Sequence, residues 1–313
     1  MRYTSLAFGI ALAAFGSAPA FASSISAATA LGDFNAIIFG NTTTSSDIEG
    51  ASVIGGNFSG ATVYNNPTDG GTVTQPAGYG ALTVFGNQTG NTNINNGGSA
   101  YIAGSHQTVN FNGGGGFYTA PPNTIADFQT SLNALSTQLA GLTATSTLPT
   151  AGNNEQINAT PGANGIAVFN ITAAQLSQIP SYIMNLNGSS SVIFNVSGSS
   201  VTFNANDESG ITGASNIIWN FYQATSVNLQ TQIAGTILAT GAAVTNGNQI
   251  DGTLVAASFN GNGELHSYGF TGALPGTTVV ATPEPTSIAL LGMGLTTLGL
   301  VRRRRALRAG KTA

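Results

Sequence analysis

The stretch that decides the fold is "QIAGTILATG" at residues 232–241, because a close copy, "QIDGTLVAAS", follows it at residues 249–258. Gln, Ile, Gly, Thr and Ala recur at matching places, and Leu254 and Val255 take the places of Ile237 and Leu238. The repeating unit that these two copies define is too short to form a domain by itself. It predicts one coil of a β-solenoid, in which neighbouring coils stack and hydrogen-bond to one another.

Shorter apolar clusters extend this pattern along the chain. "IEGASVIGG", which begins at Ile48, opens like Ile250-Asp251-Gly252. Each cluster is β-branched or aromatic and is bounded by Gly, Asn or Ser, as a strand between turns is. Further clusters occur at Val84-Phe85, Ile102, Ile193-Phe194, Ile217-Ile218 and Ile237-Leu238. A β-sandwich would also show short strands and such turns, but it gives no reason for the identity between the two copies. The predicted fold class is all-β dominated, a β-solenoid with one flanking α-helix.

The flanking helix is predicted at residues 124–142, where apolar residues recur at steps of three and four. Thr124 and Asp127 form a predicted capping box at its start. A two-stranded coiled coil would use the same stripe, but the segment is too short to sustain one. A second, shorter helix is predicted in "ITAAQLSQIP", capped by Thr172 and Gln175 and ended before Pro180. The stripe of the longer helix comprises Ile125, Phe128, Leu132, Leu135, Leu139 and Leu142.

The charge distribution excludes one class of partner. The seven basic residues are Arg2, Arg302 to Arg305, Arg308 and Lys311, so the body between them has no Lys or Arg. All eleven acidic residues lie between Arg2 and Arg302. Nucleic-acid binding needs clustered cations, and we expect none here. The chain also has no Cys, so its fold cannot depend on disulfides.

The N-terminus carries the pattern of a secretory signal peptide. Arg2 precedes an apolar run at residues 6–15, and Ala20-Phe21-Ala22 is a small-x-small cleavage site. This order of parts predicts a signal peptide at residues 1–22, removed by signal peptidase. The predicted solenoid body then occupies residues 23–281.

The C-terminus, residues 282–313, reads "TPEPTSIALLGMGLTTLGLVRRRRALRAGKTA". Its apolar segment at 286–301 is short beside the ~20 residues of a full membrane span. The arginines Arg302, Arg303, Arg304 and Arg305 would hold that helix with its basic end in the cytoplasm. The alternative is a terminal core helix with a solvated basic tail.

Pro283-Glu284-Pro285, the apolar helix and the arginines together resemble the PEP-CTERM sorting signal of exported proteins in Gram-negative bacteria. The resemblance implies an exosortase as processing partner, a transient stay in the inner membrane and cleavage near the Pro-Glu-Pro.

The body is similar to the choice-of-anchor A domain. The similarity is carried by "LGDFNAIIFGNTTTSSDIEGASVIGGNFS", "VIFNVSG", "IIWNFYQATSV", "QIAGTILATGAAVT" and "QIDGTLVAASFNGNGELHSYGFTG". It covers about residues 31–274, although Ala51 stands where the family often has a basic residue and the "WNF" segment lacks a Pro. The resemblance implies a surface or matrix protein with no enzymatic role. Its layout, a helix beside a solenoid, is also similar to bacterial ice-binding adhesin domains.

Few residues offer chemistry. Glu264 and His266 lie two apart and share a face of a strand, so they could pair or jointly hold a metal; the interpretation favoured is an acid–His pair that closes the last coil. Asp47 and Glu49 share a face in the same way and are a candidate Ca²⁺ site. Asp207-Glu208 is predicted to be a solvated turn, and His106 has no apparent partner. No catalytic residues and no cofactor other than Ca²⁺ are predicted.

These observations favour a non-enzymatic extracellular matrix or surface protein that adheres to exopolysaccharide. The alternative is binding to ice or another crystal surface through a flat face of the solenoid. That function needs outward columns of Thr, and neither Thr42 to Thr44 nor Thr72-Val73-Thr74 recurs at the coil period. A third hypothesis, an enzyme, would depend on Glu264 and His266.

Overall fold

The computed structural model describes residues 24–60, 62–65, 76–150, 152–162 and 164–276. The predicted signal peptide at 1–22 and the sorting segment at 282–313 lie outside the described residues. The chain divides into two compact units, Met1–Gly272 and Ala273–Ala313. The architecture below is that of the first unit.

Parallel strands dominate this unit, and helices are few. Every strand pair in the described part of the chain is parallel. This confirms the predicted all-β class and excludes the β-sandwich, whose sheets are antiparallel. We call one turn of the chain around the body a coil.

One wall of the body is the long path of a 14-stranded sheet, with neighbours in the order β10-β7-β4-β1-β23-β21-β18-β15-β13. Its strands are β1 (Ala36–Ile38), β4 (Ser52–Ile54), β7 (Leu82–Val84), β10 (Ala100–Ile102), β13 (Ile166–Thr172), β15 (Ser191–Ser197), β18 (Ile217–Asn220), β21 (Thr236–Asn246) and β23 (Leu254–Gly261). A second wall continues from the far halves of β21 and β23 into β2 (Thr42–Thr44), β5 (Phe58–Ser59), β8 (Gln88–Thr89), β16 (Ser200–Phe203) and β19 (Ser226–Leu229).

The third wall is formed by a 7-stranded and a 3-stranded sheet. The first contains β3 (Asp47–Ile48), β6 (Thr62–Tyr64), β9 (Thr92–Asn95), β11 (Val109–Phe111), β20 (Ile233–Ala234), β22 (Ile250–Asp251) and β24 (Leu265–His266). The second contains β12 (Glu155–Asn158), β14 (Ser181–Asn185) and β17 (Asn206–Asp207).

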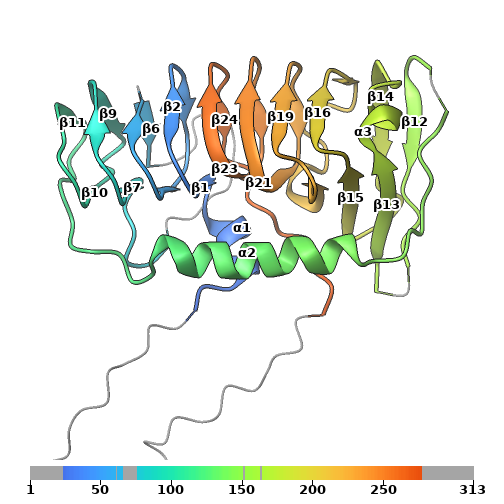
Figure 1. Cartoon of the computed structure of the whole chain (residues 1–313), viewed down its shortest axis with the longest axis horizontal. Coiled ribbons are helices and arrows are strands. Elements are labelled where there is room, and N and C mark those ends of the chain that lie inside the picture. Colours follow the sequence, from blue (N-terminus) through green and yellow to red (C-terminus); the bar gives the residue numbers. More distant parts are fainter. Residues whose placement is uncertain (1–23, 61, 66–75, 151, 163, 277–313) are drawn as a thin grey trace, which may run out of the picture. The chain divides into compact units, whose positions relative to one another are not determined.

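The coils do not follow the order of the sequence. The chain begins in the middle of the stack at β1 and winds outward to β10 at one end. Helix α2 (Ile125–Ala140) then carries it back past the starting point. From β13 the chain winds inward again until β23 pairs with β1 (Figure 1). The N-terminal and C-terminal halves therefore meet at a seam inside the body, formed by β1, β2 and β3 against β23 and β24.

The repeat of residues 232–241 at residues 249–258 is a step from one coil to the next. Ile237 pairs with Leu254 and Leu238 with Val255, as the sequence predicts. Other steps differ in length: Ala36 pairs with Ser52, whereas Ile166 pairs with the more distant Ser191. The number of residues in a coil varies because the turns at the corners differ in length, while the strands keep their register.

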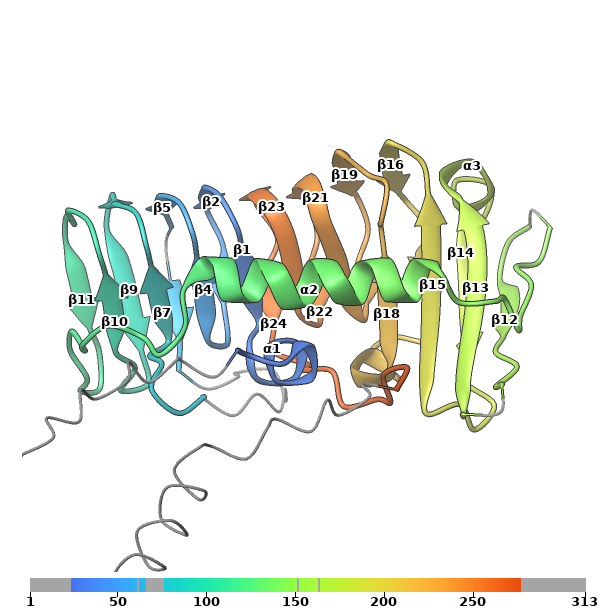
Figure 2. The ribbon, with the colours of Figure 1, turned by 60° about the horizontal axis from the view of Figure 1, so that its bottom comes forward.

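Helix α2 lies along the stack and crosses several strands (Figure 2). Phe128, Leu132, Leu135 and Leu139 are buried, and Ile125 and Leu142 are partly buried, which confirms the predicted stripe. The Asp127 carboxylate accepts from the backbone N–H of Thr124 at 2.7 Å and from its hydroxyl at 2.9 Å. The predicted cap is therefore present.

The two remaining α-helices are short. Helix α3 (Ala173–Leu176) has the predicted cap, since Gln175 N–H donates to the Thr172 hydroxyl at 3.1 Å. Helix α1 (Ala27–Asp33) is capped by Ser26 and was not predicted. A 3₁₀ turn, η1, covers Ala214–Asn216.

A ladder of three asparagines joins α2 to the strands. Asn170, Asn195 and Asn220 lie at paired positions on β13, β15 and β18. Asn195 Nδ2 donates to Asn170 Oδ1 at 2.9 Å, and Asn220 Nδ2 to Asn195 Oδ1 at 2.9 Å. The same amides reach the helix backbone: Asn195 donates to Leu139 O at 2.7 Å and Asn220 to Ser136 O at 3.0 Å.

An aromatic stack fills the core beside this ladder. Phe169 and Phe194 lie with ring centroids 4.7 Å apart, and Phe194 and Trp219 with centroids 4.1 Å apart, both nearly parallel. The indole Nε1 of Trp219 donates to Ala234 O at 3.0 Å. Each ring directly precedes one asparagine of the ladder, in "VFN", "IFN" and "IWN".

Glycines stack at one corner of the N-terminal coils. Gly56 N donates to Gly40 O at 2.8 Å, and Gly86 N to Gly56 O at 3.0 Å. A Cβ atom on Gly86 would overlap the carbonyl of Gly56. The backbones approach too closely at this corner for any residue with a side chain.

Candidate functional site

The second wall of the body presents a surface made of small uncharged side chains, which we call the polar face. It comprises β16, β19, the far halves of β21 and β23, β2, β5 and β8. Residues alternate along these strands, so that apolar side chains such as Val227 and Phe259 point into the core. The residues between them point outward.

One outward position forms a column along the body. In order of strand pairing its members are Thr202, Asn228, Thr245, Asn260, Thr43, Ser59 and Thr89. All seven carry a hydroxyl or an amide, and five of them are exposed while Asn228 and Ser59 are half-buried. The column crosses the seam at Asn260 and Thr43 without a break in register.

A second column lies two positions before the first. In the C-terminal half it contains Ser200, Ser226, Ala243 and Ser258. In the N-terminal half Asn41, Asn57 and Asn87 continue it, each Oδ1 accepting from the next coil: Asn57 N donates to Asn41 at 2.9 Å and Asn87 N to Asn57 at 2.9 Å. These bonds fix the amide orientations.

The polar face is therefore a regular array. Each strand contributes one rung to the array, and neighbouring rungs are ~4.8 Å apart, which is the distance between paired strands. Neither column contains a charged residue. As the sequence predicts, Thr does not recur on every coil. A hydroxyl or an amide does recur at all seven positions of the first column, and unequal coil lengths conceal this register in the sequence. Thr72-Val73-Thr74 lies outside the described residues.

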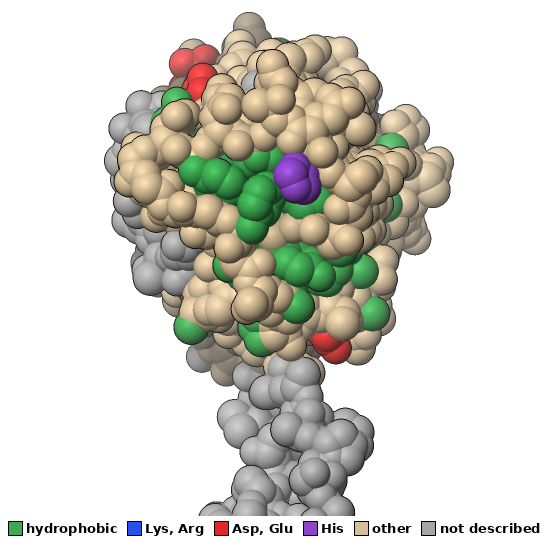
Figure 3. All heavy atoms as spheres, turned by 90° about the vertical axis from the view of Figure 1, so that its left-hand side faces the viewer, with side chains coloured by type: hydrophobic (Ala, Val, Ile, Leu, Met, Phe, Trp, Pro, Cys, Tyr) green, Lys and Arg blue, Asp and Glu red, His purple; other side chains and the backbone are tan. Residues whose placement is uncertain are grey.

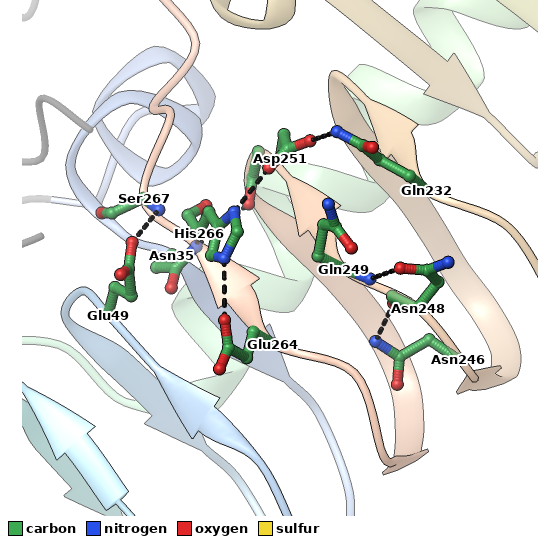
Figure 4. Close-up of polar contacts among 11 residues, drawn as sticks. Asn35, Glu49, Gln232, Asn246, Asn248, Gln249, Asp251, Glu264, His266 and Ser267 are labelled. Carbon is green, nitrogen blue, oxygen red and sulfur yellow. Dashed lines mark hydrogen bonds and ion pairs between the residues drawn. The ribbon is translucent and has the colours of Figure 1, made fainter. Parts of the chain in front are cut away.

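The predicted Glu264–His266 pair is present on the third wall, at the seam (Figure 4). His266 Nε2 lies 3.0 Å from Glu264 Oε2, and His266 Nδ1 lies 2.7 Å from Asp251 Oδ1. Asp251 is fully buried, and its contact with His266 was not predicted. Its other oxygen accepts from Gln232 Nε2 at 2.6 Å. Pairing of β22 with β24 brings Asp251 to His266, as the Ile250-Asp251-Gly252 repeat could have indicated.

Asn35 and Glu49 complete the seam from the N-terminal half. Asn35 Nδ2 donates to Gly252 O and His266 O, both at 3.0 Å, and its Oδ1 accepts from Gly50 N at 3.2 Å. Glu49 is buried and accepts from Ser267 N at 3.3 Å. These bonds support the interpretation that the acid–His pair closes the last coil.

His266 is held as a cation by its surroundings. The hydrogen bond that His266 donates to the Asp251 carboxylate raises the pKa of His266 to about 9, against the opposing effect of burial, and Glu264 and Glu49 add to the rise. Because no Lys or Arg lies between Arg2 and Arg302, protonated histidine is the one side-chain cation that the body can use.

We expect the stability of the fold to fall as pH rises from about 6.5 to about 9. The pKa of His266 is higher in the folded state than in the unfolded state. Its contribution to the free energy of unfolding is therefore complete below the unfolded pKa, and it is lost as the pH rises through the folded pKa. The raised pKa values of Asp33, Asp47 and Asp207 act at lower pH, and those of Tyr79, Tyr118 and Tyr182 at higher pH. Urea unfolding midpoints between about pH 6 and about pH 9.5 measure this loss. A His266→Gln variant that shows the same loss would contradict the assignment.

Asp47 and Glu49, the candidate calcium ligands, occupy different environments. Asp47 is half-buried, and burial raises its pKa while Glu264 and Glu49 add to the rise. Glu49 is engaged with Ser267 as described. Within the described ranges, no three His, Asp or Glu side chains gather as metal ligands. Calcium binding at Asp47 and Glu49 stays a prediction.

Two other predictions are corrected. Asp207 is not a solvated turn residue: it lies on β17, accepts from the buried Tyr182 hydroxyl at 3.2 Å, and burial raises its pKa. His106 is not alone, because its ring lies 4.6 Å from that of Phe117 at the end of the stack. Phe117 is 52% exposed and also contacts Phe111. Figure 3 shows hydrophobic side chains gathered beside a histidine on this end.

The domain family of the body follows from residues 27–267, which match the family described as "Putative Ice-binding-like adhesive domain". This chain belongs to that family. The ice-binding-like adhesive domain thus contains all three walls, the seam and the polar face. Residues 281–305 match the PEP-CTERM protein-sorting motif, which confirms the predicted sorting signal and implies processing by an exosortase-type system. The choice-of-anchor A domain is not the family matched.

Solved structures similar to this chain include two ice-binding proteins. One is from the Antarctic ascomycete Antarctomyces psychrotrophicus, with 14% identity, 78% of this chain and 97% of that chain covered, and a TM-score of 0.29. The other is from an Antarctic bacterium of the Flavobacteriaceae, with 13% identity, 77% and 81% covered, and a TM-score of 0.33. At these values the likeness carries no information on what this chain binds. Among curated proteins, none matches it.

No helix of the described segments combines the length and the apolar character that a membrane crossing requires. The predicted helix at 286–301 lies outside those segments.

Proposed function

We propose that this protein is an exported, non-enzymatic surface protein whose β-solenoid body adheres to extracellular polysaccharide through the polar face. The observation that carries the proposal is the column from Thr202 to Thr89, which offers a hydroxyl or an amide on seven successive rungs. A polysaccharide presents hydroxyls at its own regular repeat. Several rungs could therefore bind one chain at once, and weak single contacts would add up.

The charge of the body indicates the class of polymer. With eleven acidic residues and no Lys or Arg between Arg2 and Arg302, the body would repel polyanions. The polar face itself is uncharged. An uncharged polysaccharide is therefore the preferred ligand, bound by hydrogen bonds from amides and hydroxyls.

The absence of an enzymatic role belongs to this proposal. His266 is the best placed titratable group, and both its ring nitrogens are engaged by Asp251 and Glu264 within the seam. An enzyme would need a nucleophile or base facing a cleft. A His266 variant that lost a hydrolytic activity of the folded protein would support the enzyme hypothesis instead.

The sorting motif supports the proposed route. Signal peptidase would remove residues 1–22, the apolar segment at 286–301 would hold the protein in the inner membrane of a Gram-negative cell, and an exosortase would cut near Pro283-Glu284-Pro285. The intact mass of the protein from fractionated cells and medium tests this route. A product in the envelope or medium that ends near Glu284 is expected; full-length protein confined to the inner membrane would make the tail a permanent anchor.

We expect the double variant Thr43→Tyr with Thr245→Tyr to lose at least tenfold in binding to insoluble matrix polysaccharide. Both residues are exposed members of the column on opposite sides of the seam. Two large rings would hold a polymer away from Asn260, which lies between them, and from the neighbouring rungs. Cosedimentation with protein-free matrix polysaccharide from the producing cells gives the apparent Kd. Thr137→Tyr, on the exposed side of α2, is the matched control. Equal binding by the double variant and the control would refute the assignment of the polar face.

Ice binding is the second candidate, because the family is ice-binding-like and the polar face is a regular array. Thermal hysteresis and ice-crystal shaping by the purified protein test it. Activity at micromolar protein that the double variant loses would assign the polar face to ice, and its absence would leave the polysaccharide as ligand.

A further inference from the structure

A groove of two neighbouring pockets lies apart from the polar face, between the start of α1 and the loops that precede β7 and α2. The first, about 500 Å³, is lined by residues of α1 and its N-terminal approach together with Pro76, Ala77, Tyr79, Pro122 and Asn123. The second, about 460 Å³, is lined by Gly78, Tyr79, Ser99, Tyr118, Thr119, Ala120 and Pro122. Tyr79 and Pro122 belong to both, so they form the ridge between the pockets.

The ridge is rigid. The Tyr79 ring lies edge-on to Phe34 at 4.9 Å and to Phe128 at 6.1 Å, and its hydroxyl donates to Asn123 Oδ1 at 3.0 Å. Burial raises the pKa of Tyr79 to about 12, so the hydroxyl stays neutral. Gly78 adopts φ +82° where it passes Pro122. A fixed aromatic ring beside a proline is a surface for the C–H faces of a sugar ring, which are apolar.

Polar groups surround this ridge. The first pocket has the exposed hydroxyl residues Ser26 and Thr29 and the half-buried carboxylate of Asp33. The second has the side chains of Ser99 and Thr119. Partial burial raises the pKa of Asp33. Sugar hydroxyls are hydrogen-bond donors, and the oxygens of a carboxylate can accept from two of them.

We propose that this groove binds two consecutive residues of a neutral hexose polysaccharide, one residue in each pocket, against the ridge of Tyr79 and Pro122. An acidic sugar is disfavoured, because Asp33 would repel it and no pocket residue is cationic. The site is separate from the polar face and does not depend on that proposal. It gives the domain a point of attachment for a single glycan chain, in addition to the extended array.

Tetrasaccharide binding by the purified protein tests this site. The probes are cellotetraose, maltotetraose, laminaritetraose and mannotetraose, with tetragalacturonate as the acidic comparison, measured by saturation-transfer NMR and calorimetry. We expect saturable binding of at least one neutral probe and at least tenfold weaker binding of tetragalacturonate. Binding of tetragalacturonate as tight as that of every neutral probe, or no saturable binding of any neutral probe, would overturn the proposal.

Variants locate the binding. Ala77→Trp and Thr119→Trp start from exposed residues and fill one pocket each, and we expect each to weaken binding at least tenfold. Asp33→Asn, which keeps the shape, should weaken it by threefold or more. Ala134→Trp on the exposed side of α2 is the matched control, and unchanged thermal midpoints verify folding. If both pocket variants bind as the control does, or if only the Thr43→Tyr, Thr245→Tyr double variant loses binding, the groove is not the site.

Discussion

Replacing Asn220 with Ala is expected to lower the free energy of unfolding by about 3–5 kcal/mol. Asn220 is fully buried. Its amide donates to Ser136 O and Asn195 Oδ1, and its Oδ1 accepts from the Ser136 hydroxyl at 2.7 Å. Truncation takes these three hydrogen bonds from groups that are buried beside α2, and each group left unsatisfied costs ~1–3 kcal/mol. Urea unfolding followed by circular dichroism, with the m-value checked, measures the change.

Asn170→Ala is the matched control for this prediction. Asn170 occupies the end of the same ladder but is exposed, so water replaces the bonds that it makes to Leu142 O and Asn195. Its loss should cost about 1 kcal/mol. If the two variants lose the same stability, the ladder does not hold α2 against the strands. In the Asn220→Ala variant, the loss of stability should be concentrated in α2. Hydrogen exchange of the backbone amides from Leu132 to Leu139 should therefore accelerate most in that variant.

Trp219→Ala is expected to lower the free energy of unfolding by about 3–5 kcal/mol, through a cavity in the core. Trp219 is fully buried and stacks on Phe194 at one end of the aromatic stack. Its removal takes away the face that Phe194 packs against and the donor to Ala234 O. Thermal and urea unfolding measure the effect.

Trp219→Phe separates these two causes. Phe keeps the stacked ring but cannot donate to Ala234, so we expect a loss of about 1–3 kcal/mol for the unsatisfied carbonyl and the smaller volume. A Phe variant as unstable as the Ala variant would show that the hydrogen bond, and not the stack, dominates. Because Trp219 is the single Trp of the chain, its fluorescence in the parent protein reports on this core directly.

Some elements of the fold could be predicted from local sequence. The identity between residues 232–241 and 249–258 predicted the pairing of Ile237 with Leu254, because equivalent residues of stacked coils occupy equivalent places. The stripe from Phe128 to Leu139 predicted α2, since it places every apolar residue on one face. The capping box of α2 could also be predicted from local sequence, because Asp127 lies three residues after Thr124. Helix α1 was not predicted, because its segment, Ala27–Asp33, is too short to show the helical repeat of apolar residues.

Other features depend on register between unequal coils. The recurrence of Phe169-Asn170 as Phe194-Asn195 and Trp219-Asn220 was present in the sequence, but its interval is longer than that of the repeat at 232–241, and a search for the shorter interval passes over it. The column of the polar face was hidden for the same reason: Ser59 follows Thr43 after about half the interval that separates it from Thr89. Insertions at corners change sequence spacing without moving the strands.

The all-β class, the long helix and the sorting motif could be predicted from the sequence alone, because each corresponds to a contiguous or periodic pattern of residues. Only the tertiary structure decided where the two halves of the chain meet. The seam joins Asn35 to Gly252 and Glu49 to Ser267, which come from opposite ends of the domain's sequence, and it sets His266 between Asp251 and Glu264. No local pattern encodes these contacts, since they arise when α2 returns the chain across the stack and the last coil hydrogen-bonds to the first.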